Sequence, residues 1–245
     1  MLTLTLNRPD RLNALTAQMC DQLTEALEGA AAREDVRVVL LTGTGTAFSS
    51  GADLSGPAAH EGFDGTSLDR ANRIIRAIVA VDKPCVAAVN GLAAGFGCSV
   101  ALACDLVVAK HSAAFLLAFA RIGLMPDGGA TATVAASVGR ARAMRMALLG
   151  EPLAAQDAYA AGLVRHVVPD HDFDATVVQL VGRLTGGPPL AYAATKRAVN
   201  AATLGHLHEA LERERTGQTI LLRTDDVAEG MRAFAEERSP TFTGS

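Results

Sequence analysis

The sequence predicts an α/β fold, and three observations support that prediction. Short apolar runs typical of buried strands alternate with longer segments of helical periodicity. A glycine-containing turn follows the apolar run that ends at Leu41, and another follows the run that ends at Val89. With 245 residues, 49% of them hydrophobic, the chain is long enough to bury one large core. Repetition of strand, turn and helix predicts a ligand site at the strand-to-helix turns.

The first half of the chain contains the predicted strands. Leu2, Leu4 and Leu6 alternate with threonines, which predicts a strand, and Thr16 is a suitable cap for the helix that follows. Further along, the pattern predicts two buried strands, at 36–41 and 85–89, and two helices, at 67–81 and 96–102.

From Gly139 onward the pattern is mostly helical. Two glycines and two prolines at 186–189 indicate a hinge, and helices are predicted after it at 191–202, 206–223 and 226–237. We therefore divide the chain into a core at 1–187, which holds the ligand site, and a C-terminal helical region at 188–245. The second part is interpreted as an appendage or an oligomerisation element.

Composition excludes several classes of function. A net charge of −4, no Trp and only two Tyr argue against nucleic-acid binding. No apolar run is long enough to span a membrane and no leader pattern follows Met1, so we expect a cytoplasmic protein. The four cysteines form no CxxC pair, which argues against a metal site or a disulfide framework and favours buried thiols.

Familiar catalytic and nucleotide-binding motifs are incomplete. The turn from Gly43 lacks the third glycine of a dinucleotide-binding loop because Phe48 occupies that place, and the turn from Gly95 fails in the same way. Ser99 would need a glycine at Ala101 to form a nucleophile elbow. Nicotinamide, serine-hydrolase, metal and nucleoside-triphosphate chemistry therefore have no support.

The informative features are the turns at 49–53 and 91–97. Ordinary tight-turn chemistry explains them about as well as a binding role does. However, the second turn opens the helix predicted from Phe96, whose first N–H groups have no partner within the helix and suit an anion. Two such turns could form an oxyanion hole.

Five motifs recur in a characteristic order, namely Asn7-Arg8-Pro9 with Leu12-Asn13-Ala14-Leu15, 48–54, Lys83-Pro84 through Asn90-Gly91, 103–106 and 123–129. Together they span most of the chain and resemble the crotonase superfamily of enoyl-CoA hydratases and isomerases. The resemblance implies a spiral of ββα repeats and a C-terminal helical region that packs a homotrimer or a dimer of trimers. It also implies an acyl-CoA substrate whose thioester oxygen is held by the amides of Ala52 and Phe96. Coenzyme A would enter as part of the substrate, without another cofactor or a metal.

Members of this family usually have another short strand before the one that matches 2–6. We therefore expect either a shortened first hairpin or a true start upstream of Met1.

The sequence departs from the hydratase pattern at two positions. Hydratases of the family carry glutamates where this chain has Ser99 and Phe119, and neither residue is an effective acid or base near neutral pH. Asp127 stands where several isomerases of the family carry an acid. The stretches 122–129, 138–144 and 238–244 most resemble the ring-epoxide phenylacetyl-CoA isomerase branch. Without the resemblance, a structural role for Asp127, as a turn residue or a helix N-cap, would explain it as well as a catalytic role does.

These observations predict a double-bond isomerase in which Asp127 is the base. Phe115, Leu116 and Phe119 are expected to line an apolar acyl pocket that raises the pKa of Asp127. The remaining predicted substrate-binding residues are Arg11 (or Arg8), Ala14, Ser50, Asp53, Leu54, Ser99 and Lys196. For the charged ones, a solvated surface position is the alternative. Three other functions stay open: a hydratase with another base, a hydrolase or dehalogenase with Asp127 as nucleophile, and a non-catalytic acyl-CoA-binding subunit.

Overall fold

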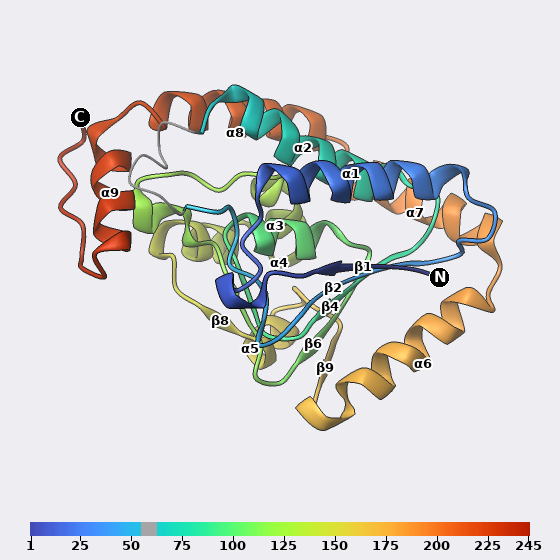
Figure 1. Ribbon diagram of the computed structural model, residues 1–245. Helices are drawn as coiled ribbons and strands as arrows, with labels where there is room; N and C mark the ends of the chain where they lie inside the picture. Colours follow the sequence, from blue (N-terminus) through green and yellow to red (C-terminus); the bar gives the residue numbers. More distant parts are fainter. Residues whose placement is uncertain (55–62) are drawn as a thin grey trace.

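The computed structural model describes residues 1–54 and 63–245 (Figure 1). Within them, the strands form two sheets, in the orders β1-β2-β4-β6-β9 and β3-β5-β7-β8. The strands are β1 (Leu2–Leu6), β2 (Val39–Gly43), β3 (Ala47–Ser49), β4 (Cys85–Val89), β5 (Leu92–Ala94), β6 (Leu106–Lys110), β7 (Ala114–Leu116), β8 (Leu153–Ala154) and β9 (His166–Val168). All pairs are parallel except β7 with β8.

The chain builds these sheets as a spiral. After β1 and α1, the strand pairs β2–β3, β4–β5 and β6–β7 each add one strand to the larger sheet and the next strand to the smaller one, and a helix then leads back. The helices are α1 (Ala17–Ala32), α2 (Gly65–Ala80), α3 (Phe96–Ala103), α4 (Ala130–Leu149), α5 (Ala155–Ala160), α6 (Phe173–Thr185), α7 (Pro189–Thr203), α8 (Leu207–Leu221) and α9 (Asp225–Ala235), with short 3-10 helices η1 (Pro9–Arg11), η3 (Ala118–Ile122) and η4 (Asp170–Asp172). The predicted α/β spiral of ββα repeats is confirmed.

Local signals placed several elements correctly and misplaced the ends of others. The predicted strands 2–6 and 85–89 match β1 and β4, and Thr16 caps α1 by accepting a hydrogen bond from the Met19 amide at 3.2 Å. Helix α2 starts two residues before the predicted 67, because the Asp64 carboxylate accepts from the amides of Thr66 and Ser67. Strand β2 starts at Val39 rather than 36, where pairing with Leu2 of β1 begins.

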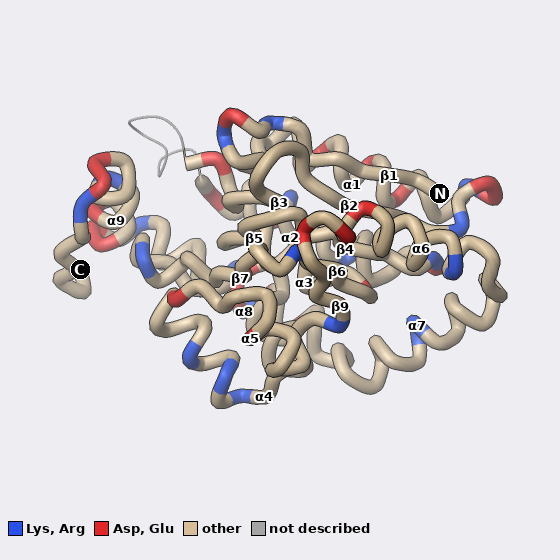
Figure 2. Tube along the Cα trace, turned by 90° about the horizontal axis from the view of Figure 1, so that it is seen from below, with Lys and Arg blue, Asp and Glu red and all other residues tan. Residues whose placement is uncertain are grey.

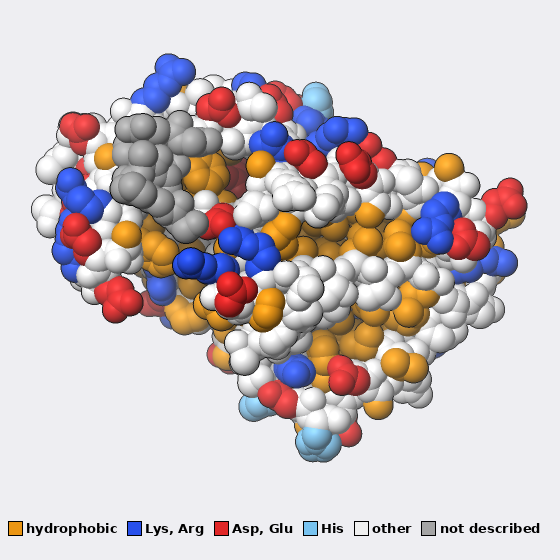
Figure 3. Space-filling view, viewed as in Figure 1, with side chains coloured by type: hydrophobic (Ala, Val, Ile, Leu, Met, Phe, Trp, Pro, Cys, Tyr) orange, Lys and Arg blue, Asp and Glu red, His pale blue; other side chains and the backbone are white. Residues whose placement is uncertain are grey.

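The larger sheet is covered on both faces. One face, with α1, α2 and α3, forms the main core. The other packs under α6, where Val38, Val86 and Val108 meet Phe173 and Val177. Because β1 is the edge strand, hydrophobic side chains are visible on both sides of it, between α1 and α6 (Figure 3).

The C-terminal helices pack onto this core. Helix α8 lies beside α2 (Figure 1), and its Leu207 and Leu211 belong to the main core. Helix α7 starts at Pro189, the last residue of the predicted hinge and two residues before the predicted helix start. The three predicted C-terminal helices therefore exist, whereas the boundary between 1–187 and 188–245 stays a prediction.

Helix α9 and the tail after it support the segment that leads to the candidate site. Acidic and basic residues alternate around α9 (Figure 2), where Glu229 pairs with Arg232 and Arg238. The Asp226 carboxylate accepts hydrogen bonds from the amides of Thr243 and Gly244, which folds the tail back onto the helix. On its other side α9 contacts η3, the 3-10 helix that contains Phe119.

Lys196 on α7 is buried rather than available to a phosphate. Its ammonium donates to the carbonyl oxygens of Ile78 at 2.7 Å and Lys83 at 3.2 Å, and forms a salt bridge with Asp105 at 2.9 Å. These contacts use all three N–H donors of the ammonium group and join α7 to the N-terminal end of β4. Burial raises the pKa of Asp105, and the charge of Lys196 opposes that shift.

Among the described residues, no helix is both long enough and apolar enough to cross a membrane.

Lys196→Met should lower the free energy of unfolding by about 1–3 kcal/mol, because the substitution removes the largely buried cation that pairs with Asp105, whose side chain is 22% exposed. Urea denaturation followed by circular dichroism measures this. Arg197→Met is the matched control, since the next residue of the same helix pairs with Asp82 in solvent and should cost less than about 1 kcal/mol. Equal losses in the two variants would contradict the structural role of Lys196.

Candidate active site

The turn at 49–52 and the turn at 94–97 lie against each other without room for side chains. A Cβ added to Gly97 would lie 2.6 Å from the Ser49 Cβ and 2.9 Å from the Ser49 carbonyl oxygen. A Cβ added to Gly51, whose φ is +100°, would lie 2.9 Å from the Ala94 carbonyl oxygen and 3.3 Å from the Phe96 nitrogen. The glycines in these turns therefore bring the two backbones together.

This approach leaves two neighbouring N–H groups available. Ala52 forms a parallel bridge with Leu15, whose two hydrogen bonds involve the Gly51 carbonyl and the Asp53 amide, so the Ala52 amide points to the opposite side. Phe96 is the first residue of α3, and its amide has no partner within the helix. Standard backbone dimensions put the two nitrogens within about 7 Å of each other, which permits both to reach one oxygen.

Buried polar side chains hold the first turn in place. The Asn13 amide donates to the carbonyl oxygens of Thr44 and Ala47, each at 2.8 Å. The Ser49 hydroxyl donates to the Asn13 carbonyl at 2.9 Å and accepts from the Gly51 amide at 3.1 Å. Because Asn13 and Ser49 are fully buried, these bonds fix the direction of the peptide that precedes Ala52.

The loop that carries Asp127 packs against the start of α3. A Cβ added to Gly128 would lie 2.7 Å from the Phe96 ring and 3.0 Å from the Ser99 Cβ, so this loop contacts both residues. The Ser99 hydroxyl donates to the Asp127 carbonyl oxygen at 2.8 Å. The structure thus brings Ser99, Asp127 and the Phe96 end of α3 together, with Ser99 fixing the backbone of Asp127. Phe119 is buried in η3, just before this loop.

The two oxygens of the Asp127 carboxyl group have different surroundings. Oδ2 accepts a hydrogen bond from the Gln218 side chain at 2.9 Å. Oδ1 is shielded from solvent and, among the buried side-chain atoms of the described residues, is the one without a hydrogen-bond partner. The pKa of Asp127 is raised to about 7: burial raises it most, the hydrogen bond from Gln218 lowers it, and the nearby charge of Glu214 raises it. A carboxyl group with this pKa can take up and release a proton near neutral pH.

The interpretation of Asp127 as a helix N-cap is wrong. The cap position of α4 is Gly129, and the helix start is bound instead by Glu214 of α8. The Glu214 carboxylate accepts from the amides of Gly129 at 2.6 Å and Thr131 at 2.9 Å. Asp127 contributes only a backbone turn here, through its carbonyl and the Ala130 amide at 3.3 Å.

Sequence analysis missed Glu214 and Gln218. Both are 1% exposed. They continue the stripe of α8 that begins with Leu207 and Leu211, at a spacing typical of the buried face of a helix. Polar residues at two successive core positions were the signal that could have identified them.

Most of the predicted coenzyme A contacts gather beside the first turn. The Arg8 guanidinium binds the Asp53 carboxylate at 2.7 Å and the Ala14 carbonyl at 2.8 Å. The Ser50 hydroxyl donates to the Arg11 carbonyl at 3.4 Å. Leu54 follows Asp53 directly at the end of the described segment. Because Arg8 is engaged by Asp53, Arg11 is the exposed cation of this group.

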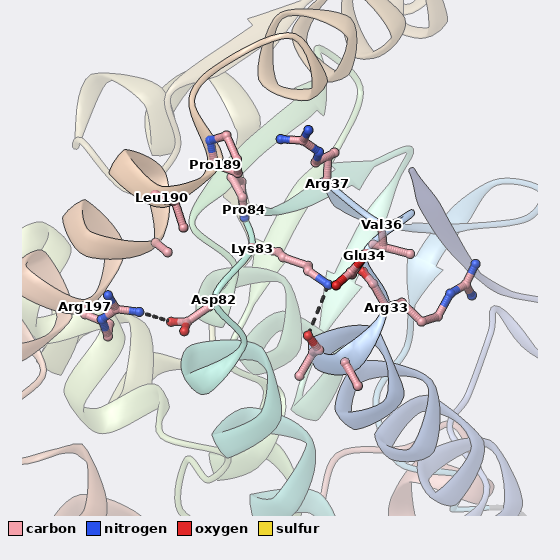
Figure 4. A pocket seen from close by; sticks show the side chains of 13 residues that line it. Arg33, Glu34, Val36, Arg37, Asp82, Lys83, Pro84, Pro189, Leu190 and Arg197 are labelled. Carbon is pink, nitrogen blue, oxygen red and sulfur yellow. Dashed lines mark hydrogen bonds and ion pairs between the residues drawn. The ribbon is translucent and has the colours of Figure 1, made fainter.

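Lys196 is not part of this group, and its occupied donors count against the predicted phosphate contact. Lys196 lies at the N-terminal ends of β4 and β6 instead. A pocket of about 730 Å³ lies on the same side of the sheet, between the ends of α1 and α2 and the start of α7 (Figure 4). Arg197 and Lys83 in that pocket are already engaged, because Arg197 binds Asp82 and Lys83 donates to the carbonyls of Ala30 and Arg33. The predicted coenzyme A contacts other than Lys196 lie elsewhere, beside the turn that contains Ala52.

In the described ranges 1–54 and 63–245, no cluster of His, Cys, Asp or Glu has the arrangement of a metal site. The chemistry available to these residues is the transfer of a proton by Asp127 and the stabilisation of an oxyanion by backbone amides.

Comparison with known proteins gives three consistent findings. The family model described as enoyl-CoA hydratase/isomerase matches residues 1–245. The chain is 40% identical to 1,2-epoxyphenylacetyl-CoA isomerase of Escherichia coli K12 and 44% identical to a protein named probable enoyl-CoA hydratase of Rhodobacter capsulatus; each match covers 100% of this chain and 95% of the relative. A crystal structure of an enoyl-CoA hydratase from Mycobacterium avium subsp. paratuberculosis K-10 superposes with a TM-score of 0.93 at 49% identity, over 98% of this chain and 94% of the other.

Gly97→Ala should lower the free energy of unfolding by about 1–3 kcal/mol, because the added methyl group would overlap Ser49 and force the two turns apart. Gly182→Ala is the matched control. A Cβ at that exposed position in α6 would meet nothing within 4 Å, so the change should be neutral or stabilising by up to about 1 kcal/mol. Denaturant unfolding compares the two, and a harmless Gly97→Ala would show that the turns need no glycine contact.

Proposed function

The chain belongs to the enoyl-CoA hydratase/isomerase family, and we propose that within it the protein is an acyl-CoA isomerase that moves a carbon–carbon double bond with Asp127 as its base. One observation carries this proposal. The Asp127 carboxyl group is desolvated, has one oxygen without a partner and has a pKa raised to about 7. A single group of this kind can remove a proton from the α or γ carbon of an acyl thioester and return it at the other position.

The proposed oxyanion hole is formed by the amides of Ala52 and Phe96. Removing a proton next to a thioester pushes negative charge onto the thioester oxygen, and two preorganised N–H groups stabilise that charge as it develops. The loss of one such donor costs about 3–4 kcal/mol in comparable sites. The interlocked turns support this role because they hold the backbone rigidly before substrate binds.

Hydration is the less well supported reaction. It needs one group to activate water and another to handle the second proton. The hydroxyl of Ser99 is engaged by the Asp127 carbonyl, and Phe119 has no proton to exchange. One free carboxylate oxygen matches the demands of isomerisation better than those of hydration.

The substrate is proposed to be an enoyl-CoA thioester. Its coenzyme A part would pass Arg11, Ala14, Ser50, Asp53 and Leu54, and its acyl part would lie against Ser99 and the buried Phe119. The reaction as proposed needs no cofactor besides the coenzyme A of the substrate. The cytoplasmic location stays a prediction.

Asp127→Asn should reduce double-bond migration by about 10²–10⁴-fold while leaving acyl-CoA affinity nearly unchanged, since Asn keeps the shape but cannot accept the proton. In the wild type, kcat/KM should fall about tenfold per pH unit below the pKa of Asp127, because the protonated carboxyl is no base. Turnover of a panel of enoyl-CoA esters measures the loss of rate and its pH dependence. Absorbance follows the shift of the double bond, and mass spectrometry shows that no water has been added. Asp174→Asn on exposed α6 is the control and should behave as wild type.

The products also separate the alternatives. Addition of water would identify a hydratase, release of free coenzyme A a hydrolase, and binding without turnover a non-catalytic subunit. Unchanged isomerisation in Asp127→Asn would rule out the role proposed for its carboxylate.

We further propose that the chain assembles as a homotrimer or a dimer of trimers through its C-terminal helices. Large apolar side chains lie exposed there, including Leu190, Val199, Ile220 and Phe234 at 85%, 52%, 65% and 65%. Such surfaces favour association because they remove apolar area from water. Light scattering at micromolar concentration should give three or six times the chain mass, and a monomeric mass would contradict the proposal.

A further inference from the structure

We propose that Gln218 and Glu214 of α8 are positioning residues of this site: Gln218 holds one carboxylate oxygen of Asp127 so that Oδ1 alone is presented to the substrate, and Glu214 keeps the start of α4 away from that carboxylate. This inference rests on the proposed function, because it assigns the supports of the base in that reaction.

The orientation of the Gln218 amide is determined at both ends. Its Oε1 accepts from the Met125 amide at 3.1 Å, and its Nε2 donates to Asp127 Oδ2 at 2.9 Å. Flipping the amide would set its NH₂ group against the Met125 N–H, so only the observed orientation satisfies both partners. The buried Gln218 thereby connects two points of the Asp127 loop to a rigid helix.

The loop needs this external support. Asp127 precedes two glycines with φ of +62° and +74°, in a segment that belongs to neither η3 nor α4. A carboxylate on such a segment could rotate and exchange its oxygens. The bond to Oδ2 fixes the rotation, which leaves the lone pairs of Oδ1 in one direction, as proton transfer requires.

Glu214 acts on the same carboxylate through the helix beside it. The first amides of a helix attract anions, and Asp127 lies just before α4. Glu214 occupies the amides of Gly129 and Thr131 and also binds the Thr131 hydroxyl at 2.5 Å. Asp127 is thus denied the donors that would make its carboxylate a weaker base, and the negative charge of Glu214 lies nearby instead.

Other neighbouring groups contribute little charge to this balance. Helix α3 presents the uncharged Phe96 and Ser99 to the loop, and η3 presents Phe119. On α8, Arg215 is paired with Asp69 of α2 at 2.5 Å, and Arg213 acts on Glu214. Burial raises the pKa of Asp127 most, and Gln218 and Glu214 are the side chains that adjust it further, in opposite directions.

The opposite signs define the experiment. Gln218→Leu removes a hydrogen bond to the charged carboxylate, so the pKa of Asp127 rises and the acid limb of the kcat/KM profile should move up by about one pH unit. Glu214→Gln removes a negative neighbour while keeping an oxygen that accepts from α4, so the limb should move down. Gln218→Glu places a second carboxyl group beside Asp127, and its limb should move up further than in Gln218→Leu.

A merely structural role would not produce this pattern, because general loosening of the loop lowers turnover at every pH without shifting the limbs in opposite directions. Thr216→Ala, on the exposed face of α8, is the matched control and should keep the wild-type profile. At high pH, where Asp127 is ionised in all variants, Gln218→Leu should still turn over about tenfold more slowly with KM unchanged, because the free oxygen is no longer aimed.

A carbon-13 NMR titration of the Asp127 carboxyl, assigned by its loss in Asp127→Asn, gives the same pKa values without turnover. Wild-type protein that moves no double bond would refute the proposed function, and the NMR titration would then decide the inference alone. Active wild type with unmoved limbs, or with both limbs moving the same way, would overturn the inference and leave the function standing. If Glu214→Gln does not fold, the two Gln218 variants decide it: an acid limb unmoved in both of them overturns the inference.

Discussion

The close approach of the two turns around Gly51 and Gly97 is the constraint on which the rest of the site depends. A side chain at either position would collide with the backbone or with Ser49 of the facing turn, so the turns meet only because both residues lack one. Their contact fixes where α3 begins and therefore where the Phe96 amide points. The same contact orients the Ala52 amide. The Asn13 side chain donates to the Ala47 carbonyl, and the Ser49 hydroxyl bonds the Asn13 carbonyl and the Gly51 amide, so the peptides around Ala52 are held in place. The packing of the two turns thus leaves the amides of Ala52 and Phe96 without a backbone partner among the described residues.

The surroundings of Asp127 disfavour the negative charge that its proposed role as a base requires. Burial raises its pKa from 3.8 to about 7. The folded protein therefore binds the proton more tightly than the unfolded chain does. The resulting stability is complete below about pH 4 and is lost as the pH rises toward 7, so at neutral pH the ionised group costs stability. A residue selected for stability alone would not be placed there, which supports its interpretation as part of a reaction site.

An element or contact of this protein could be predicted from the sequence where the residues that determine it lie close together along the chain. Strands 2–6 and 85–89 and the Thr16 cap follow from periodicity and capping, which operate over a few residues. Strands β3, β5 and β7 have only three residues each, too few for a periodic pattern, and exist because the spiral stacks them. The contacts of Gln218 and Glu214 join residues about 90 positions apart in the sequence, and so does the salt bridge between Lys196 and Asp105. No local pattern could therefore predict these contacts. The close contact of the turns at 49–53 and 91–97 could be anticipated because glycine is favoured where two backbones touch, whereas their oxyanion role stays a prediction.

The names of relatives do not separate isomerase from hydratase, and the structure shows why. This chain is 40% identical to a named isomerase and 44% identical to a protein named as a probable hydratase. Both reactions pass negative charge to a thioester oxygen, so both need the same fold and the same oxyanion donors, and a family match alone does not tell them apart. The difference lies in proton handling, and that is decided at the few positions that face the reacting carbons. Ser99 binds a backbone carbonyl, Phe119 is apolar, and Asp127 keeps an oxygen free, so under the proposed function these three residues are the ones that distinguish isomerisation from hydration.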